Sequence, residues 1–416
     1  MAGTSDNTSR CGRWDFSELR THAVHAHEHE WSGSSCCRKR LPQSWAPDVE
    51  AVLRKRSVQL LIVLTADSRN ATRALTLANI AAFSQLNEVR AHFVAVVGRC
   101  NDWNSVGSAA ATLGVPFECV ARPAETSDNG SAADTQFRPK LPLQLLGAQR
   151  HMARLRSRTD ADAIGMPKAH SEPPFDAIWL PDADIAFSAD TISAFLVRWA
   201  CAFEGGSPLV AQPAMHHDVS RTGRSQQFWP LNYGREWQPG GRLASVGAYA
   251  MHTAYVEQQA PLLDAPFFAW FADELGGPLA AMQAAHGTDV GTDQLWCRAA
   301  AHYEQQRRRA ASQQQPAEQA AARPSCAVIP TPFRHRGMQR RRSPAFWRGV
   351  GLVREAAERR WPQYWLREAL LQFYRLSSAH VESSKSLGAD VCMVRRVSST
   401  RLGAACGGGA AHGSAG

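Results

Sequence analysis

The sequence has no cysteine pattern of the kind that marks zinc modules or disulfide-rich domains. Its ten cysteines are scattered over 416 residues, no C-x-x-C pair occurs, and only Cys36 and Cys37 are adjacent. Structural zinc sites and disulfide frameworks show closely or regularly spaced cysteines. The sequence therefore predicts neither class, and its cysteine usage leaves the redox compartment open.

Long apolar runs are also missing. No stretch has the roughly 20 consecutive apolar residues of a membrane-spanning helix, and no signal peptide is recognisable at the N-terminus. Taken literally, this predicts a soluble cytosolic protein, with an incomplete N-terminus as the alternative. Glycosylation-type triplets begin at Asn7, Asn70 and Asn129 and matter only if the chain enters the secretory route.

A broad basic face is the third missing feature. The formal net charge is +9, but much of it is concentrated at 307–309 and 334–342. Charge alone therefore favours anionic partners without selecting among nucleotide diphosphates, acidic glycans, nucleic acids and anionic lipids.

The overall composition is that of a globular protein. With 44% hydrophobic and 20% charged residues, the chain can bury a sizeable core in one or two domains. Residues 1–50 are polar and include four closely spaced histidines, and residues 381–416 are rich in Ser, Gly and Ala. Both ends are expected to be disordered tails.

Apolar runs alternate with an amphipathic segment in the first part of the chain. Residues 58–64 (VQLLIVL) and 92–98 (HFVAVVG) predict buried strands, with a helix at 70–83 between them and a weaker strand at 116–121. This alternation predicts a doubly wound α/β sheet.

The turn after the first predicted strand contains Asp67 and Arg69. Ligands bind outside the carboxyl ends of the strands in open α/β sheets, so both side chains are candidates for contacting a nucleotide. Ordinary turn polarity explains the two residues equally well.

A later apolar run, FDAIWLPDADIAF at 175–187, contains two aspartates separated by one alanine. Residues two apart on an extended chain face the same side, so Asp182 and Asp184 are expected to converge at the end of the strand. Two carboxylates held together favour a bound metal ion, because like charges otherwise repel. The same tripeptide at 160–162 follows no apolar run and is expected to lie in a loop.

Three further side chains are candidates because of their surroundings. Glu257 stands in a mostly apolar neighbourhood, and Asp293 precedes a predicted helix at 294–301. Asp293 is therefore either the cap of that helix or a general base or acceptor-binding group. His335 follows a late apolar run and is a candidate third metal ligand, although a lone histidine is more often structural.

The remaining segments extend the α/β pattern. We expect two helices and a strand at 140–156, 190–202 and 207–215. The segment 216–247 suits either an active-site loop or a structural loop, and 303–323 is expected to be a solvated insert. From 343 onward, helices interrupted by Pro362 are expected to pack on the preceding domain.

Six short motifs occur in a recognisable order between Val58 and Gln339. They are Lys140 at the start of a predicted helix, IWLPDADIA, AQPAM at 211–215, YVEQQAP at 255–261, VGTD ending in Asp293, and HRGMQ with His335, Gly337 and Gln339. In these motifs the chain resembles the family known as domain of unknown function 707, itself similar to GT-A glycosyltransferases. The sequence departs from that family's pattern at Pro181, at Ala183, where an acidic residue is usual, and at Val290, where tryptophan is usual.

The resemblance implies the fold class and its boundaries. We expect an α/β, GT-A-like domain over 56–342, with a mixed, mostly parallel sheet and helices on both faces. C-terminal helices over 343–380 are expected to pack on this domain.

The resemblance also implies an activity, the metal-dependent transfer of a sugar from a nucleotide diphosphate sugar to a glycan or other hydroxyl acceptor. Mn²⁺ or Mg²⁺ is expected as the cofactor, because manganese accepts a histidine nitrogen beside carboxylate oxygens. The expected metal ligands are Asp182, Asp184 and His335. The expected donor-binding residues are Asp67, Arg69, Lys140, Asp182 and Arg336, and the expected acceptor-side residues are Asp293 and Glu257.

The implied partners are the nucleotide sugar donor and the acceptor, and no nucleic acid is expected. The implied compartment is the Golgi lumen, and membrane association is compatible with the sequence, although it contains no spanning segment.

Two other functional classes compete with a transferase. A phosphatase could use the first aspartate of an Asp-x-Asp pair as its nucleophile. The late position of this strand, and Ala186 where threonine or valine is usual, disfavour that class. A GT-A-like scaffold could also bind glycan or nucleotide without turnover, because fold does not establish chemistry.

Overall fold

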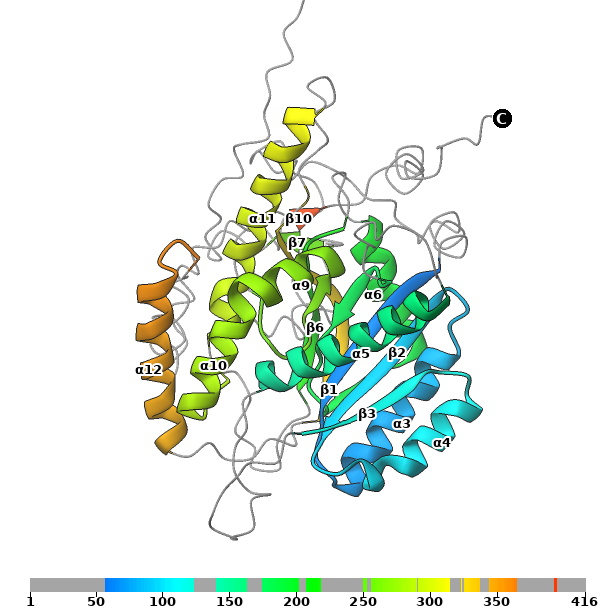
Figure 1. Cartoon of the computed structure of the whole chain (residues 1–416). Helices are drawn as coiled ribbons and strands as arrows, with labels where there is room; N and C mark the ends of the chain where they lie inside the picture. Colours follow the sequence, from blue (N-terminus) through cyan, green and yellow to red (C-terminus); the bar gives the residue numbers. More distant parts are fainter. Residues whose placement is uncertain are drawn as a thin grey trace, which may run out of the picture.

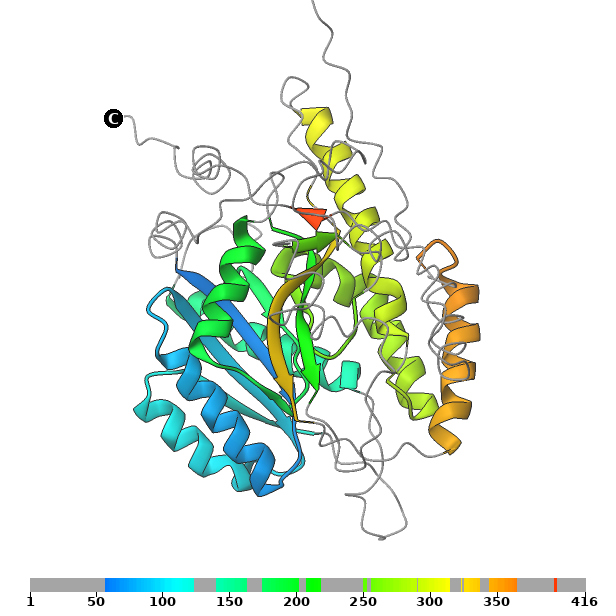
Figure 2. The same ribbon diagram turned by 180° about the vertical axis from the view of Figure 1, so that it is seen from behind.

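The computed structural model describes residues 57–122, 140–162, 174–201, 207–217, 250–252, 256–289, 291–314, 323, 325–336, 344–364 and 393–394. In this part of the chain a twisted sheet lies between two layers of helices (Figures 1 and 2). The predicted tails, the second helical segment from 365 onward, most of the segment 216–247, and Val290 lie outside the described residues. Within the predicted C-terminal tail, Met393–Val394 is described as a short strand.

The described strands form one mixed sheet in the order β10-β7-β9-β6-β8-β4-β1-β2-β3, with β5 paired to β9 off this path. Their bounds are β1 Val58–Thr65, β2 Val89–Val97, β3 Phe117–Ala121, β4 Ala177–Trp179, β5 Ile185–Ala186, β6 Val210–His217, β7 Ala250–His252, β8 Leu262–Asp264, β9 Cys326–His335 and β10 Met393–Val394. The long ladders β1–β2, β2–β3 and β6–β9 are parallel, as is β1–β4, whereas β8 runs antiparallel between β4 and β6.

The alternation of side chains along β1 explains why helices cover both faces. Leu60, Ile62 and Leu64 enter one buried cluster, and Leu61 and Val63 enter the other. A strand that is apolar on both faces must be covered on both faces. The helices of the first layer are α3 (Asn70–Ser84), α4 (Asn104–Thr112) and α6 (Ala189–Cys201).

The second layer contains α5 (Lys140–Asp162), α9 (Ala265–Phe271), α10 (Gly277–His286) and α11 (Thr292–Gln314). A 3₁₀ turn, η2 (Cys100–Trp103), precedes α4, and a π-helical turn, η4 (Ala272–Gly276), joins α9 to α10. Helix α12 (Pro344–Arg360) lies outside α10, and its Val353 and Ala357 are buried in the second cluster. The predicted fold class is thus confirmed as α/β, with a mixed, mostly parallel sheet and helices on both faces.

Three local predictions differ from the structure. The tripeptide at 160–162 ends helix α5 and does not lie in a loop, because the helix continues past the amphipathic stretch used to predict it. Helix α11 runs to Gln314, past the predicted helix end at residue 301. Its residues 305–312 are exposed, in agreement with the predicted solvated segment, and Ala, Gln and Arg favour helix without needing a buried face. Helix α4 was not predicted, because its small polar residues carry little periodic signal.

A glycine brings α5 against the sheet and so fixes the position of the helix start. A Cβ atom at Gly147 would lie 2.7 Å from Val96 Cγ2 and 2.9 Å from Val63 Cγ1. The helix can approach β1 and β2 this closely only because that side chain is absent. Lys140, the first residue of α5, is thereby held at one edge of the sheet.

In the part of the chain that the structure describes, two disulfides link cysteines that are far apart in the sequence. Cys100 is bonded to Cys119, and Cys297 is bonded to Cys326. The second bond joins α11 to the first residue of β9 and is buried, with the two residues 5% and 0% exposed. Spacing alone did not identify these pairs, because the partners meet only through the tertiary fold. None of the helices that the structure describes is both long and apolar enough to cross a bilayer.

Replacing Cys297 and Cys326 together by alanine is expected to lower the free energy of unfolding by about 3–4 kcal/mol, because the bond closes a loop with a sequence separation of 29. Urea unfolding of the wild type and the double variant measures the difference. Reduction of the wild type should reproduce much of it. Two free thiols at these positions in non-reduced protein, detected by mass spectrometry, would contradict the pairing.

Candidate metal centre and active site

The two aspartates lie in a connection between strands and not on one continuous strand. Strand β4 ends at Trp179, a turn includes Ala183 and Asp184, and β5 starts at Ile185. The turn is closed by the Ile185 N–H, which donates to the Asp182 carbonyl oxygen at 3.2 Å. The predicted convergence of Asp182 and Asp184 is therefore produced by a turn, and not by the two-residue alternation of an extended chain.

Strand pairing brings His335 to this turn. Strand β5 runs antiparallel to the end of β9, with Ile185 opposite His335 and Ala186 opposite Arg334. The Arg336 N–H also donates to the Asp184 carbonyl oxygen at 2.9 Å. His335, about 150 residues after the aspartates, is thus fixed beside them by backbone hydrogen bonds on both sides.

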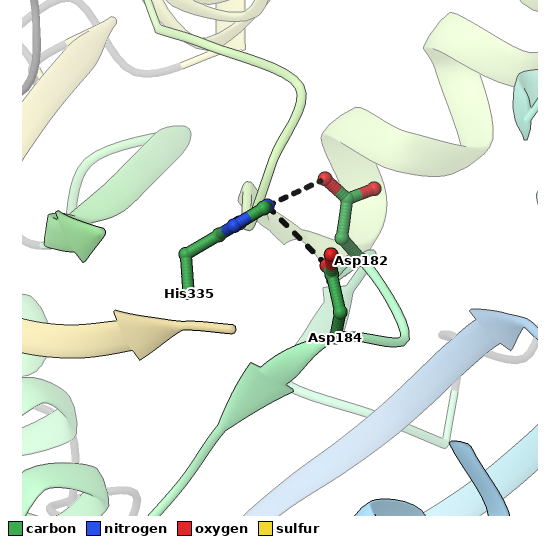
Figure 3. Close-up of side chains that lie close together, drawn as sticks. All are labelled: Asp182, Asp184 and His335. Atoms are coloured by element: carbon green, nitrogen blue, oxygen red, sulfur yellow. Dashed lines mark ion pairs between the residues drawn. The ribbon is translucent and has the colours of Figure 1, made fainter. Parts of the chain in front are cut away.

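The three side chains form a compact group (Figure 3). His335 Nε2 lies 3.3 Å from Asp184 Oδ1 and 3.8 Å from Asp182 Oδ2. One ligand atom from each residue lies within 4.8 Å of the others, and the side chains of His335 and Asp184 are 1% and 12% exposed. Two carboxylate oxygens and one imidazole nitrogen at this separation fit a divalent ion such as Mn²⁺.

The charges in this group stabilise one another. Burial alone would raise the pKa of Asp182, but the Lys140 ammonium and His335 outweigh it and hold that pKa below its usual value. Burial alone would lower the pKa of His335, but the hydrogen bond to Asp182 and the charges of Asp184 and Asp182 raise it above its usual value. A metal ion would therefore compete with a proton for the His335 nitrogen, because both are favoured by the two carboxylates.

Lys140 connects this group to a second segment. Its Nζ lies 2.6 Å from Asp182 Oδ1 and donates to the Gln258 carbonyl oxygen at 2.5 Å, and the residue is only 8% exposed. The Asp182 N–H donates to the Gln259 carbonyl oxygen at 2.6 Å. On the other side, Gln212 Oε1 accepts a hydrogen bond from the Glu257 N–H. The turn 257–259 is therefore held at three consecutive residues.

Glu257, held in this way, has an unusual environment. The residue is 5% exposed, and burial, followed by the charges of Asp293 and Asp182, raises its pKa to about 8. Asp293 lies in the first turn of α11, where the N-terminal end of the helix dipole favours a negative charge. The structure thus places Glu257 within electrostatic range of both Asp182 and Asp293, and Glu257 is protonated at neutral pH.

Asp67 and Arg69 lie at the same edge of the sheet, in the turn between β1 and α3. Strands β1 and β4 are parallel, with Ile62 opposite Trp179, so their carboxyl ends are neighbours. The Asp67 carboxylate accepts hydrogen bonds from Arg69 Nε at 2.5 Å and Thr72 Oγ1 at 2.7 Å. Burial alone would raise the pKa of Asp67. The hydrogen bonds from Thr72 and Arg69, with the charge of Arg69, outweigh burial and hold that pKa below its usual value, so the carboxylate is ionised at neutral pH. The side chain of Arg69 is 47% exposed, which leaves it accessible to a ligand.

Arg334 and Arg336 flank His335 and are both exposed. Their position follows from the last residues of β9, whose alternation directs His335 inward and its neighbours outward. Gly337 and Gln339 of the HRGMQ motif lie outside the described residues.

Two buried glutamines near the site were not identified as site residues from the sequence. Gln212 is 2% exposed and holds the Glu257 N–H. Gln283 on α10 is 0% exposed and holds the loop that precedes Asp293. Gln212 belongs to the AQPAM motif, so a polar residue inside a predicted strand was a usable signal. No comparable signal marks Gln283, which stands in an ordinary helical stretch.

No protein-family model matches the sequence, and a comparison with curated proteins gives no match. The resemblance to domain of unknown function 707 therefore stays a prediction.

Solved structures similar to the chain include mannosyl-3-phosphoglycerate synthase from Rubrobacter xylanophilus, with 14% identity over 87% of this chain and 93% of that one and a TM-score of 0.36. TarS from S. aureus in complex with UDP-GlcNAc has 10% identity over 78% and 74% of the two chains, with a TM-score of 0.36. The mannosyltransferase PcManGT from Pyrobaculum calidifontis, in complex with GDP-Man and Mn²⁺, has 10% identity over 88% and 85%, with a TM-score of 0.30. At these values the similarities carry no statement about the chemistry of this chain, which has to come from its own site.

Proposed function

We propose that this protein is a metal-dependent glycosyltransferase that moves a sugar from a nucleotide diphosphate sugar to a glycan or other hydroxyl acceptor. The observation that carries the proposal is the group of Asp182, Asp184 and His335, whose ligand atoms lie within 4.8 Å of one another. The group stands at the carboxyl ends of β1 and β4, where ligands bind in α/β sheets, and Glu257 is within electrostatic range of both Asp182 and Asp293.

Asp182, Asp184 and His335 would hold Mn²⁺ or Mg²⁺. When bound, the ion would neutralise the negative charge that builds on the departing diphosphate. Carboxylates suit both ions, and the imidazole favours Mn²⁺.

The donor side of the proposed site contains four further residues. Asp67 and Arg69 follow β1 and would contact the nucleotide, and Arg336 would add positive charge at the phosphates. Lys140 would act next to the donor by keeping Asp182 ionised and in place, since its ammonium lies 2.6 Å from Asp182 Oδ1.

The acceptor side contains Asp293 and Glu257. Asp293 would take the proton of the attacking hydroxyl. Burial first, and then the charges of Asp293 and Asp182, raises the pKa of Glu257 to about 8, which keeps the proton on Glu257 and leaves Asp293 as the acceptor-side carboxylate without one. Glu257, which carries its own proton at neutral pH, would donate a hydrogen bond and would not serve as the base.

The two disulfides support a proposal about compartment. Cytosolic thiols are kept reduced, whereas disulfides persist in oxidising compartments. We propose that the domain folds in the lumen of the secretory pathway. The Golgi assignment within that pathway, and association with its membrane, rest on the resemblance alone.

A thermal-shift panel of nucleotide diphosphate sugars, each with and without Mn²⁺, tests the proposed function. One donor is expected to raise the melting temperature in the presence of Mn²⁺ but not in its absence, because ion and diphosphate bind together. Nucleoside monophosphates, which offer the ion no diphosphate, serve as matched controls. If a donor shifts the melting temperature but no hydroxyl acceptor gives a product, the protein binds the donor without turnover. If no donor shifts the melting temperature, the proposal is contradicted.

A further inference from the structure

Helix α12 lies against α10, on the side of the domain away from β1 to β3 (Figures 1 and 2). The two helices touch where α10 ends. A Cβ atom built at Gly349 of α12 would lie 2.1 Å from the carbonyl oxygen of His286, the last residue of α10. Real Cβ atoms do not approach an oxygen this closely, so the contact requires glycine at this position.

The loop after α10 leads to Asp293, which lies in the first turn of α11. It begins with Gly287, which has a positive φ of 61° that closes the helix, and it leads into the first turn of α11. His286, the residue touched by α12, is therefore adjacent to the loop that positions the carboxylate.

Gln283 fixes this loop from inside the protein. Its Nε2 donates to the Asp289 carbonyl oxygen at 3.2 Å and to Thr292 Oγ1 at 3.0 Å, and the Thr288 N–H donates to the Gln283 carbonyl oxygen at 3.1 Å. Gln283 and Thr292 are 0% and 1% exposed. Since Thr292 directly precedes Asp293, the position of α10 sets the position of that carboxylate.

We propose that Gly349 and Gln283 are positioning residues for Asp293, so that α12 acts through α10 as the support of the acceptor side of the site. The proposal rests on the proposed function for the role of Asp293, but the coupling of α12 to the loop is a separate physical claim. It makes helix α12 a functional part of the site and not only a cover for α10.

The expected effect of disturbing this contact is large. Alanine at position 349 would force the helices apart by about 1 Å to relieve the clash with His286. A displacement of about 1 Å at a reacting group lowers turnover by about 100-fold. Donor binding should be unchanged, because the proposed donor residues lie on α5 and in the connections after β1, between β4 and β5, and after β9.

Gly351→Ala is the matched control. Gly351 stands in the same helix, is exposed, and has no atom within 4 Å of its ideal Cβ position. Both substitutions raise helix propensity equally, and only Gly349→Ala creates a clash. Gln283→Met is the second variant, because it keeps a similar volume and removes both side-chain hydrogen bonds to the loop.

Two measurements test the proposal. In hydrogen exchange followed by mass spectrometry, Gly349→Ala and Gln283→Met are expected to increase exchange of the 287–293 amides at least tenfold, with Gly351→Ala at the wild-type level. In kinetics, both variants are expected to lower kcat by about 100-fold, with the donor-induced thermal shift in Mn²⁺ unchanged.

The outcomes separate the proposal from the proposed function. Equal exchange in Gly349→Ala and Gly351→Ala, or wild-type exchange in Gln283→Met, overturns the coupling. Loss of kcat together with loss of the donor shift also overturns it, because that is the result of general destabilisation. If the wild-type protein shows no transfer at all, the proposed function fails, but hydrogen exchange of the 287–293 amides still tests the coupling of α12 to the loop. If Gly349→Ala does not fold, the exchange measured in Gln283→Met tests that coupling.

Discussion

Asp184→Asn is expected to abolish the Mn²⁺-dependent thermal shift and to lower turnover at least about 10³-fold, equivalent to about 4 kcal/mol of transition-state stabilisation. Asparagine keeps the size of the side chain but removes the negative charge that faces His335 Nε2 at 3.3 Å. A neutral amide is a weaker ligand for a hard divalent ion, and the remaining Asp182 is already paired with Lys140 at 2.6 Å. Thermal shift with Mn²⁺ and donor, followed by single-turnover kinetics, measures both effects.

The chain offers a matched control for this variant. Asp162→Asn changes the second aspartate of the other Asp-Ala-Asp tripeptide, which ends helix α5. That variant should keep the wild-type shift and turnover. A wild-type Mn²⁺ response in Asp184→Asn would remove Asp184 from the metal site and with it the main support for the proposed function.

The metal group shows how far sequence reasoning reached. Context separated Asp182 and Asp184 from the other copy of their tripeptide, since only one copy follows an apolar run. The predicted geometry of the pair was nevertheless wrong. The single strand expected over 175–187 is divided into β4 and β5, and a turn between them brings the two aspartates together. A two-residue strand such as β5 has too little periodicity to be seen in a sequence.

His335 illustrates a contact that only the sheet could reveal. Its place beside Asp184 depends on the antiparallel pairing of β5 with β9, and cross-strand register is set by partners that are far apart in the chain. Its position after a late apolar run made it a candidate ligand and the resemblance agreed, but neither could show that the two strands pair. The same reason explains the disulfides, since Cys297 and Cys326 meet only when α11 lies beside the start of β9.

Buried polar residues are the other part of the site that sequence reasoning did not find. Gln212 and Gln283 hold backbone and side-chain groups on two different loops. A glutamine in an apolar stretch signals that a polar group is buried, but the sequence does not say which group it satisfies. The sequence therefore predicted the two carboxylates of the acceptor side. The glutamines that hydrogen-bond the segments carrying them were found only in the structure.

The two acceptor-side carboxylates are expected to respond differently to loss of charge. Asp293→Asn should lower turnover by about 10²–10⁴-fold, the usual contribution of a general base. Glu257→Gln should lower it less than about tenfold, because the pKa of Glu257 is raised to about 8 and glutamine resembles the protonated carboxyl that is present at neutral pH. Equal losses in the two variants, or a larger loss in Glu257→Gln, would reverse the assignment of the base.

The pH profile provides an independent readout of the same pair. Burial first, and then the charges of Asp293 and Asp182, raises the pKa of Glu257 from 4.5 to about 8. The folded protein therefore holds this proton more tightly than the unfolded chain, so the contribution of Glu257 to stability is fully present below pH 4.5 and falls as pH rises toward about 8. Above that pH the ionised Glu257 repels Asp293, and turnover should fall as well.

Substitutions locate the group responsible for this alkaline limb. Glu257→Gln should remove the limb from both the stability curve and the rate profile. Asp293→Asn should move it to lower pH in the stability curve, because one of the charges that raises the pKa of Glu257 has gone. A limb that keeps its position in Glu257→Gln belongs to another group, and the protonated Glu257 would then have no part in acceptor binding. A limb that disappears in Glu257→Gln and shifts in Asp293→Asn establishes that the two carboxylates act as one electrostatic unit, with the proton on Glu257 leaving Asp293 free to serve as the base.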